Sequence, residues 1–179
     1  MTSTDRIPTL TELVALATRT GQALCRARLV VATGESCTGG LVGHLITEVP
    51  GSSDWFAGAA VTYSYAAKEQ VLGVDPQDLA RYGAVSPQVA RQMAHGVLRL
   101  LPEAQVAVAI TGIAGPTGGT PDKPVGLVYL HLAAQDGTER GECRIWSADR
   151  RGNKLLSAQL ALEMLYEHAQ RRGGVDPCV

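Results

Sequence analysis

The feature that most constrains the fold of this chain is a glycine-rich junction between two apolar runs. Residues 34–40 read Gly-Glu-Ser-Cys-Thr-Gly-Gly and stand between the runs 29–32 and 41–46. This pattern predicts a buried strand, a tight turn and a helix. Backbone N–H groups at such a junction point outward at the positive end of a helix dipole, where phosphates, carboxylates and developing oxyanions bind well. The junction is therefore the first place to look for an active site.

Strand and helix signals alternate along most of the chain, and an antiparallel hairpin follows them. Thr9 and Glu12 form a capping box that starts the first helix, and Ser86 before Pro87 starts a later one. The pair Asp136-Gly137 is typical of a hairpin turn. Together these signals predict a layered α/β domain with a mixed sheet. The expected helices cover 10–26, 38–49, 64–71, a turn from 76, 86–101 and 152–171, and the expected strands cover 28–33, 57–63, 106–110, 127–133 and 142–146.

Composition narrows the class of protein. A chain of 179 residues with 45% hydrophobic and 18% charged residues suits one folded domain, expected over 9–171 between flexible termini 1–8 and 172–179. A net charge of -1 without a basic stripe argues against nucleic acid as a partner. No apolar run reaches the roughly 20 residues that span a bilayer, and the start of the chain lacks a signal-peptide pattern. We therefore expect a cytoplasmic protein with no membrane partner.

Metal and disulfide chemistry are not expected from the sequence. The cysteines form no CxxC pair, and the histidines fall at unrelated positions on expected helices or a strand, so no metal or other cofactor is predicted. These residues are Cys25, Cys37, Cys143, Cys178, His44, His95, His131 and His168.

Ser36 has two interpretations from the local pattern alone. The junction lacks the Gly-Lys-Ser/Thr of a P-loop and the GxGxxG of a Rossmann turn. It comes near a nucleophile elbow, but Thr38 stands where that motif needs glycine. In one interpretation, Ser36 is a nucleophile, and loop N–H groups form an oxyanion hole for the substrate. In the other, Ser36 or Thr38 is the N-cap of the helix. In the second case Gly39 and Gly40 simply permit close packing of helix on sheet.

The neighbours of Ser36 offer further alternatives. Cys37 competes as a nucleophile because a helix N-terminus lowers a thiol pKa, but no histidine lies in the other candidate loops to act as its base. Glu35 is either a base or a ligand for a ribose hydroxyl, or a polar residue that satisfies buried N–H groups.

Lys68 lies in the first turns of the helix that follows Tyr63. A cation is disfavoured near a helix N-terminus, and burial adds to this effect, so the lysine pKa should fall. A neutral lysine can act as a general base toward a serine, either directly or through a tyrosine hydroxyl. The alternative is an exposed helix lysine whose stem covers the core.

Two further segments carry candidate ligand-binding residues. The stretch 111–126 is long, rich in glycine and proline and without expected structure, which is typical of a functional loop, although turns alone explain its composition. Lys123 in that loop could meet a phosphate. Arg150 and Lys154 at the start of the final helix either bind an anionic group or are solvated charges.

Six motifs occur in an order that resembles the CinA C-terminal domain family, whose stand-alone members are nicotinamide-nucleotide amidohydrolases. The resemblance covers about residues 9–170. It departs from the family pattern at Gly34, where alanine is common, and at Lys154, where a bidentate arginine is expected. The motifs are Gly34–Gly40, Gly51–Ser53 with Trp55-Phe56, Val61–Ser64 with Lys68, Gly83–Ser86, Thr111–Pro116 and Lys123–Gly126.

The resemblance implies a three-layer α/β/α sandwich and a reaction without cofactor. Nicotinamide mononucleotide and water would give nicotinate mononucleotide and ammonia, a step in pyridine nucleotide recycling. The family's catalytic serine, tyrosine and lysine fall on Ser36, Tyr63 and Lys68, with Thr38 as a reserve nucleophile. We also expect a homo-oligomer, with a dimer as the working assumption. The expected substrate-binding residues are Glu35, Thr38, Gly39, Gly40, Ser52, Ser53, Thr111, Gly112, Gly115, Lys123 and Arg150.

Two other functions compete with this hypothesis. One is a non-catalytic nucleotide-binding or regulatory module that keeps the pocket without turnover. The other is hydrolysis of a nucleotide pyrophosphate, for which the sequence offers no carboxylate cluster to hold a metal.

Overall fold

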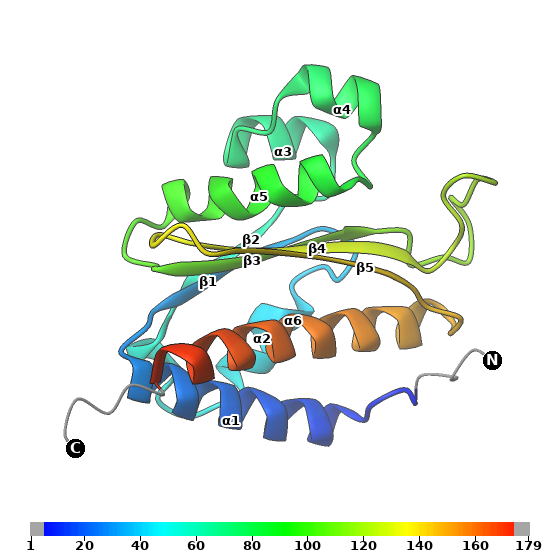
Figure 1. The fold of residues 1–179 in the computed structure, drawn as a ribbon. Helices are drawn as coiled ribbons and strands as arrows, with labels where there is room; N and C mark the ends of the chain where they lie inside the picture. Colours follow the sequence, from blue (N-terminus) through cyan, green and yellow to red (C-terminus); the bar gives the residue numbers. More distant parts are fainter. Residues whose placement is uncertain (1–5, 174–179) are drawn as a thin grey trace.

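A computed structural model describes residues 6–173 of the chain, which form one five-stranded sheet between two layers of helices (Figure 1). The order across the sheet is β2-β1-β3-β4-β5. β1 pairs in parallel with β2 and β3, whereas β4 pairs antiparallel with β3 and β5, so the expected mixed sheet is confirmed. The strands are β1 (Val31–Glu35), β2 (Phe56–Val61), β3 (Val106–Gly112), β4 (Leu127–Ala134) and β5 (Glu139–Ile145).

The helices lie on both faces of the sheet, which confirms the three-layer α/β/α architecture (Figure 1). One layer contains α1 (Leu10–Ala27), α2 (Leu41–Thr47) and α6 (Arg150–Gly173). The other contains α3 (Tyr65–Leu72), α4 (Pro76–Tyr82) and α5 (Pro87–Leu100), while the 3₁₀ turn η1 (Ser52–Asp54) leads into β2. Within residues 6–173, none of these helices combines the length and apolar character needed to cross a membrane.

The central strand β3 shows why the two layers pack differently. Its valines and Ile110 join the hydrophobic core beneath α1 and α6, whereas Ala107 and Ala109 join the core beneath α5. Small side chains on that face allow α5 to come close, and a Cβ on Gly34 would lie only 2.8 Å from Cγ2 of Val97. α5 therefore packs closely on β1 and β3, the two strands whose carboxyl ends border the candidate site.

Several expected boundaries in the first half shift by two or three residues. The Thr9 capping box of α1 is confirmed, but the helix ends on Arg28, which adopts a left-handed conformation with φ 54°. The first strand therefore starts at Val31 rather than at 28. α2 starts at Leu41 rather than near 38 because Gly39 and Gly40 have positive φ and complete the turn before the helix begins.

The hairpin between β4 and β5 has the expected turn and a longer second strand. The N–H of Ala134 donates to the carbonyl of Thr138, and Gly137 has φ 88° at the tip. β5 begins at Glu139 rather than at 142, because pairing with β4 continues up to the turn.

The expected flexible termini are only partly within the described residues. Within that range, Pro8 is buried and α6 continues to Gly173, while the expected flexibility of the termini stays a prediction. The remaining expected terminal residues, 1–5 and 174–179, lie outside the described range.

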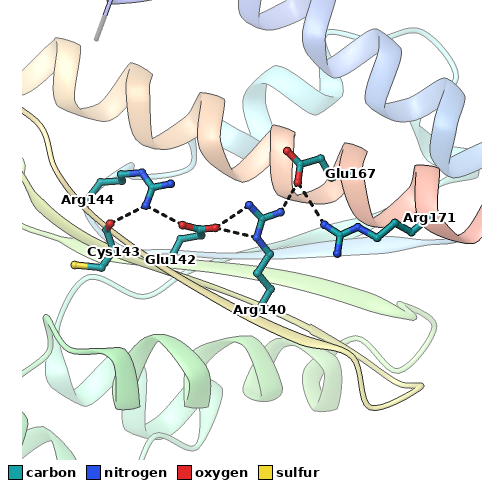
Figure 2. Close-up of polar contacts among 6 residues, drawn as sticks. All are labelled: Arg140, Glu142, Cys143, Arg144, Glu167 and Arg171. Atoms are coloured by element: carbon teal, nitrogen blue, oxygen red, sulfur yellow. Dashed lines mark hydrogen bonds and ion pairs between the residues drawn. The ribbon is translucent and has the colours of Figure 1, made fainter. Parts of the chain in front are cut away.

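The edge strand β5 is joined to α6 by a row of ion pairs (Figure 2). Glu142 lies between Arg140 and Arg144, with side-chain N–O distances of 2.7 and 2.8 Å. Arg140 also reaches Glu167 of α6, which in turn is 3.4 Å from Arg171. Charged side chains on an edge strand also discourage pairing with another sheet.

Two histidines expected at unrelated positions lie close together in the fold. The ring nitrogens of His95 on α5 and His131 on β4 are each 3.1 Å from a carboxylate oxygen of Glu139, and Arg91 binds the same carboxylate. Helix and hairpin packing bring these residues together, which sequence spacing could not show. Within residues 6–173, no group of three or more His, Cys, Asp or Glu residues has the arrangement of a metal site.

Candidate active site

The candidate site lies at the carboxyl ends of the parallel strands β1 and β3, where α/β folds usually bind ligands. Ser36 directly follows β1, and its N–H donates to the carbonyl of Ile110 on β3 at 3.1 Å. A cleft of about 240 Å³ opens beside it. The cleft is lined by Ser36, Cys37, Tyr63, Ala84, Val85, Thr111, Gly112, Ile113, Ala114, Gly115, Thr117, Gly118 and Arg150.

Lys68 and Ser36 form a direct pair at the base of the cleft. Nζ of Lys68 lies 3.0 Å from Oγ of Ser36 and donates to the carbonyl of Thr62 at 2.6 Å. The short helix α3 supplies the lysine, and its N-cap Ser64 accepts from the N–H of Ala67. Lys68 is fully buried, so the interpretation as an exposed helix lysine is wrong.

Burial changes the chemistry of the Lys68 amine. Loss of water around the charged form lowers its pKa from 10.5 to about 8. At pH 7 roughly one-tenth of the molecules then carry a neutral amine, a few hundredfold more than for an ordinary lysine. The neutral amine has a lone pair that can accept the Ser36 hydroxyl proton across the 3.0 Å contact.

Cys37 has the opposite electrostatic setting. Its thiol is buried next to Ser36, and burial raises its pKa to about 11. A neutral thiol is a weak nucleophile at neutral pH. The geometry therefore favours Ser36 over Cys37 as the attacking group.

Glu35 has a structural role that the sequence left as one of two alternatives. The side chain is fully buried, and its carboxylate accepts from the N–H groups of Gly40, Val42 and Gly43 at 3.0, 3.2 and 2.9 Å. It thereby caps α2 with a fixed negative charge. Its oxygens are occupied, so the structure does not support contact between Glu35 and a substrate.

The Glu35 cap also changes which loop amides can hold an oxyanion. The α2 amides that the sequence suggested for anion binding already donate to Glu35. Among the described residues, the N–H group of Cys37 donates to no backbone or side-chain oxygen. Cys37 follows the serine and lines the cleft, which is the usual position of an oxyanion donor after a nucleophile.

Tyr63 lies at the mouth of the cleft rather than between the serine and the lysine. Its side chain is 63% exposed, and its hydroxyl accepts from Nη2 of Arg150 at 3.4 Å. Only its backbone carbonyl approaches Nζ of Lys68, also at 3.4 Å. Since Lys68 already contacts Ser36, the geometry gives no support to a proton relay through the Tyr63 hydroxyl.

Arg150 joins the cleft to a second hollow. Its Nη1 donates to the carbonyl of Gly115 at 2.8 Å, which ties the start of α6 to the glycine-rich loop. A Cβ on Gly39 would lie 3.9 Å from Nζ of Lys154, so Gly39 lies beside Lys154, but it lines neither hollow. The second hollow has a volume of about 530 Å³ and is lined by Leu10, Leu41, Asp149, Arg150, Arg151, Lys154 and Leu155.

Several expected binding residues do not reach the cleft. Ser52 and Ser53 lie on η1, just before Phe56, which pairs with Val31 at the start of β1. They are therefore at the opposite end of the sheet from Ser36, because a five-residue strand separates the two ends.

Two other junction residues differ from their expected roles. Thr38 is fully buried, outside the cleft lining, and its hydroxyl has no hydrogen-bond partner among the described residues. Gly40 is the left-handed residue that starts α2, with φ 91°, and it also lies outside the cleft lining.

Residues of the loop 111–126 line the cleft, but the charged side chain of Lys123 does not. Thr111, Gly112 and Gly115 all line the cleft, as expected. Nζ of Lys123 instead donates to backbone carbonyls of the turn that joins α4 to α5. Ala84 and Val85 of that turn line the cleft and were not expected there, because apolar side chains carry no chemical signal beyond the motif Gly83–Ser86.

These features define a class: a three-layer α/β domain with a buried serine–lysine pair at the carboxyl ends of its parallel strands. The sequence profile described as "CinA C-terminal domain" matches residues 13–169. The chain therefore belongs to the CinA C-terminal domain family.

Relatives and solved structures agree with this membership. A "CinA-like protein" of Desulfosudis oleivorans is 47% identical over 152 residues, which cover 85% of this chain and 37% of that protein. A "CinA-like protein" of Salinibacter ruber is 51% identical over 144 residues, covering 80% of this chain and 34% of the relative. The chain thus spans little more than a third of the length of these curated relatives.

The crystal structure of competence/damage inducible protein CihA from Agrobacterium tumefaciens superposes with a TM-score of 0.84 at 42% identity, covering 91% of this chain and 98% of that one. A CinA superfamily protein from Klebsiella pneumoniae superposes with a TM-score of 0.83 at 31% identity, covering 89% and 98%. The fold is therefore that of solved CinA superfamily proteins.

Proposed function

We propose that this protein is an amidohydrolase that converts nicotinamide mononucleotide and water into nicotinate mononucleotide and ammonia. The observation that carries the proposal is the 3.0 Å contact between Ser36 and a buried Lys68 whose pKa is lowered to about 8. Such a pair suits nucleophilic attack on a carboxamide without a metal or organic cofactor. The nucleotide substrate follows from the family resemblance, and its recycling role follows with it.

In the first half of the reaction, Oγ of Ser36 attacks the carboxamide carbon and its proton passes to Nζ of Lys68. The C=O bond opens to an oxyanion that the N–H group of Cys37 can hold. The C–N bond then breaks, and Lys68 returns its proton to the leaving nitrogen. Ammonia departs, and the acyl group remains as an ester on Ser36.

In the second half, water replaces ammonia in the same geometry. Lys68 takes a proton from the water as it attacks the ester carbon. Collapse of the second oxyanion breaks the ester bond, and the proton held by Lys68 returns to Oγ. The products are a free Ser36 and the pyridine carboxylic acid, which loses its proton to solvent to become the carboxylate, so each catalytic group ends in its starting state.

The cleft and the second hollow suggest how the nucleotide lies. The cleft of about 240 Å³ takes the pyridine ring with its amide at Ser36. The larger hollow contains the side chains of Arg150, Arg151 and Lys154. Within residues 6–173 none of these three cations pairs with an acidic side chain, which leaves them available to a phosphate. Ribose and phosphate would therefore extend past Arg150.

Ammonia release from nicotinamide mononucleotide tests the proposal. Ser36→Ala should lower kcat by about 10³-fold or more while leaving the fold intact, because the nucleophile is lost. Ser147→Ala is the matched control, since Ser147 is exposed and outside both hollows. A Ser36→Ala variant that keeps the wild-type rate would refute the mechanism. Nucleotide binding without any ammonia release by the wild type would instead favour the non-catalytic module.

A further inference from the structure

The turn between α4 and α5 is one wall of the cleft, although it contains no residue with catalytic chemistry. Ala84 and Val85 line the cleft together with Ser36. The turn starts at Gly83, whose φ of 71° ends α4, and it leads into Ser86, the N-cap of α5. The position of this wall determines how much room a flat ring has beside the serine.

The backbone of this turn is held by three side chains from three other parts of the chain. Nζ of Lys123 donates to the carbonyl of Val85 at 2.7 Å and also to that of Tyr82. Oγ1 of Thr111 donates to the carbonyl of Ala84 at 2.7 Å. The hydroxyl of Tyr65 accepts from the N–H of Ala84 at 3.1 Å.

Each of these side chains belongs to an element that also shapes the candidate site. Thr111 is on β3, the strand that accepts the N–H of Ser36. Tyr65 begins α3, the helix that carries Lys68. Lys123 comes from the loop that forms the far side of the cleft. The turn is therefore fixed relative to the nucleophile, the base and the loop together.

Of the three side chains that hold the turn, only Lys123 is a cation. Its hydrogen bonds should be the strongest of the three sets, because a charged donor forms stronger hydrogen bonds than a neutral one. The lysine is half-buried, and within residues 6–173 it pairs with no carboxylate. Its amine faces the turn, so that a Cβ on Gly83 would lie 3.3 Å from Nζ. Lys123 is also not among the cleft-lining residues.

We propose that Lys123 is a positioning residue that holds the turn between α4 and α5 in place, and thereby sets the width of the ring pocket, and is not a ligand of the substrate phosphate. The inference rests on the proposed function and assigns this residue a different role from the phosphate contact that the sequence suggested. A phosphate bound by Lys123 would have to compete with two backbone carbonyls that already occupy two of the three ammonium N–H groups.

Kinetics with two substrates separates the two roles. Lys123→Met should lower kcat/KM for nicotinamide mononucleotide by about 10- to 100-fold, mainly through KM, because a displaced wall loosens the fit of the ring. The same fold loss should occur with nicotinamide riboside, which has no phosphate. The matched control is Lys154→Met in the second hollow, whose loss should appear only with the phosphate-bearing substrate. A Lys123→Met loss confined to the mononucleotide would overturn the proposal.

Two further readouts distinguish positioning from general damage. Lys123→Arg should recover part of the lost kcat/KM, because a guanidinium can also donate to both carbonyls. The pH dependence of kcat/KM for Lys123→Met should keep the midpoint near 8 that Lys68 determines. A variant that shifted this midpoint would act on the catalytic pair, and the positioning role would be wrong.

Hydrogen exchange without substrate tests, independently of turnover, whether Lys123 holds the turn between α4 and α5; we call this contact the clamp. Backbone amides at 83–86 should exchange faster in folded Lys123→Met than in the wild type, while amides of α5 keep their protection and Lys154→Met shows no change. Unchanged exchange at 83–86 would refute the clamp even if the enzyme is active. If the wild type released no ammonia from either substrate, the proposed function would fail, while faster exchange would still support the clamp.

Discussion

Replacing Lys68 with methionine should abolish catalysis and, at neutral pH, make the protein more stable. The fully buried amine has a pKa of about 8 in the folded chain and 10.5 ordinarily. At about 1.4 kcal/mol for each pKa unit, the folded state disfavours the charged lysine by about 3 kcal/mol. Losing the hydrogen bonds to Ser36 and Thr62 offsets about 1–2 kcal/mol of this. Lys68→Met should therefore gain about 1–2 kcal/mol at pH 7.

The sign of the pH dependence makes this prediction specific. Because the folded pKa lies below the unfolded one, the unfolded chain binds more protons between pH 8 and 10.5. Wild-type stability should therefore rise by about 3 kcal/mol relative to Lys68→Met as the pH increases through this window. Urea unfolding of both proteins at pH 7 and above pH 10, with ammonia release measured in parallel, tests both effects. A stability difference that does not change with pH, or a variant that keeps its turnover, would refute the assignment of Lys68.

Three other predictions concern the same site, and a fourth concerns the assembly of the protein. For the wild type, log(kcat/KM) should rise with unit slope as the pH increases and level off near pH 8, when Lys68 becomes neutral; a flat profile from pH 6 to 9 would exclude it as the base. Tyr63→Phe should change kcat/KM by less than about tenfold in the ammonia assay, well below the 10²–10⁴ of a lost proton relay. Glu35→Gln should lower the free energy of unfolding by about 1–3 kcal/mol, because an amide cannot accept from all three N–H groups, whereas exposed Glu48→Gln should stay within about 0.5 kcal/mol in the same urea titration. The expected homo-oligomer stays a prediction, and light scattering in solution would measure its mass.

The fold was largely predictable because its signals are local. The Thr9 capping box, the Ser86-Pro87 helix start and the Asp136-Gly137 turn depend on residues within four positions of one another. The start of β1 was less predictable. Arg28 ends α1 in a left-handed conformation, which delays the strand and which apolar periodicity does not reveal. Hydrophobicity at 29–30 predicts burial, but the pairing of β1 with two neighbours decides where the strand begins.

In the candidate site, the pair Ser36 and Lys68 was predictable from the sequence, whereas the contacts of the surrounding charged residues were less so. Ser36 and Lys68 are 32 positions apart in the sequence, and the family motifs contain both residues. The partners of Glu35 and Lys123 could not be predicted in the same way. Each is a charged side chain in a glycine-rich setting, and only the fold shows that its charge is directed at backbone groups of the chain and not at a ligand.

The N-termini of α2 and α6 bear on how the phosphate of the proposed nucleotide substrate would be bound. A helix N-terminus attracts anions, but at α2 the carboxylate of Glu35 already accepts from three amides. At α6 the carboxylate of Asp149 accepts from the N–H of Gly152 at 2.7 Å. Because a carboxylate of the chain already occupies amides at both ends, we expect cationic side chains to supply much of the binding of the proposed phosphate. Arg150 and Lys154 should therefore account for most of the preference for mononucleotide over nucleoside, and a double Met variant should lose that preference while still hydrolysing the riboside.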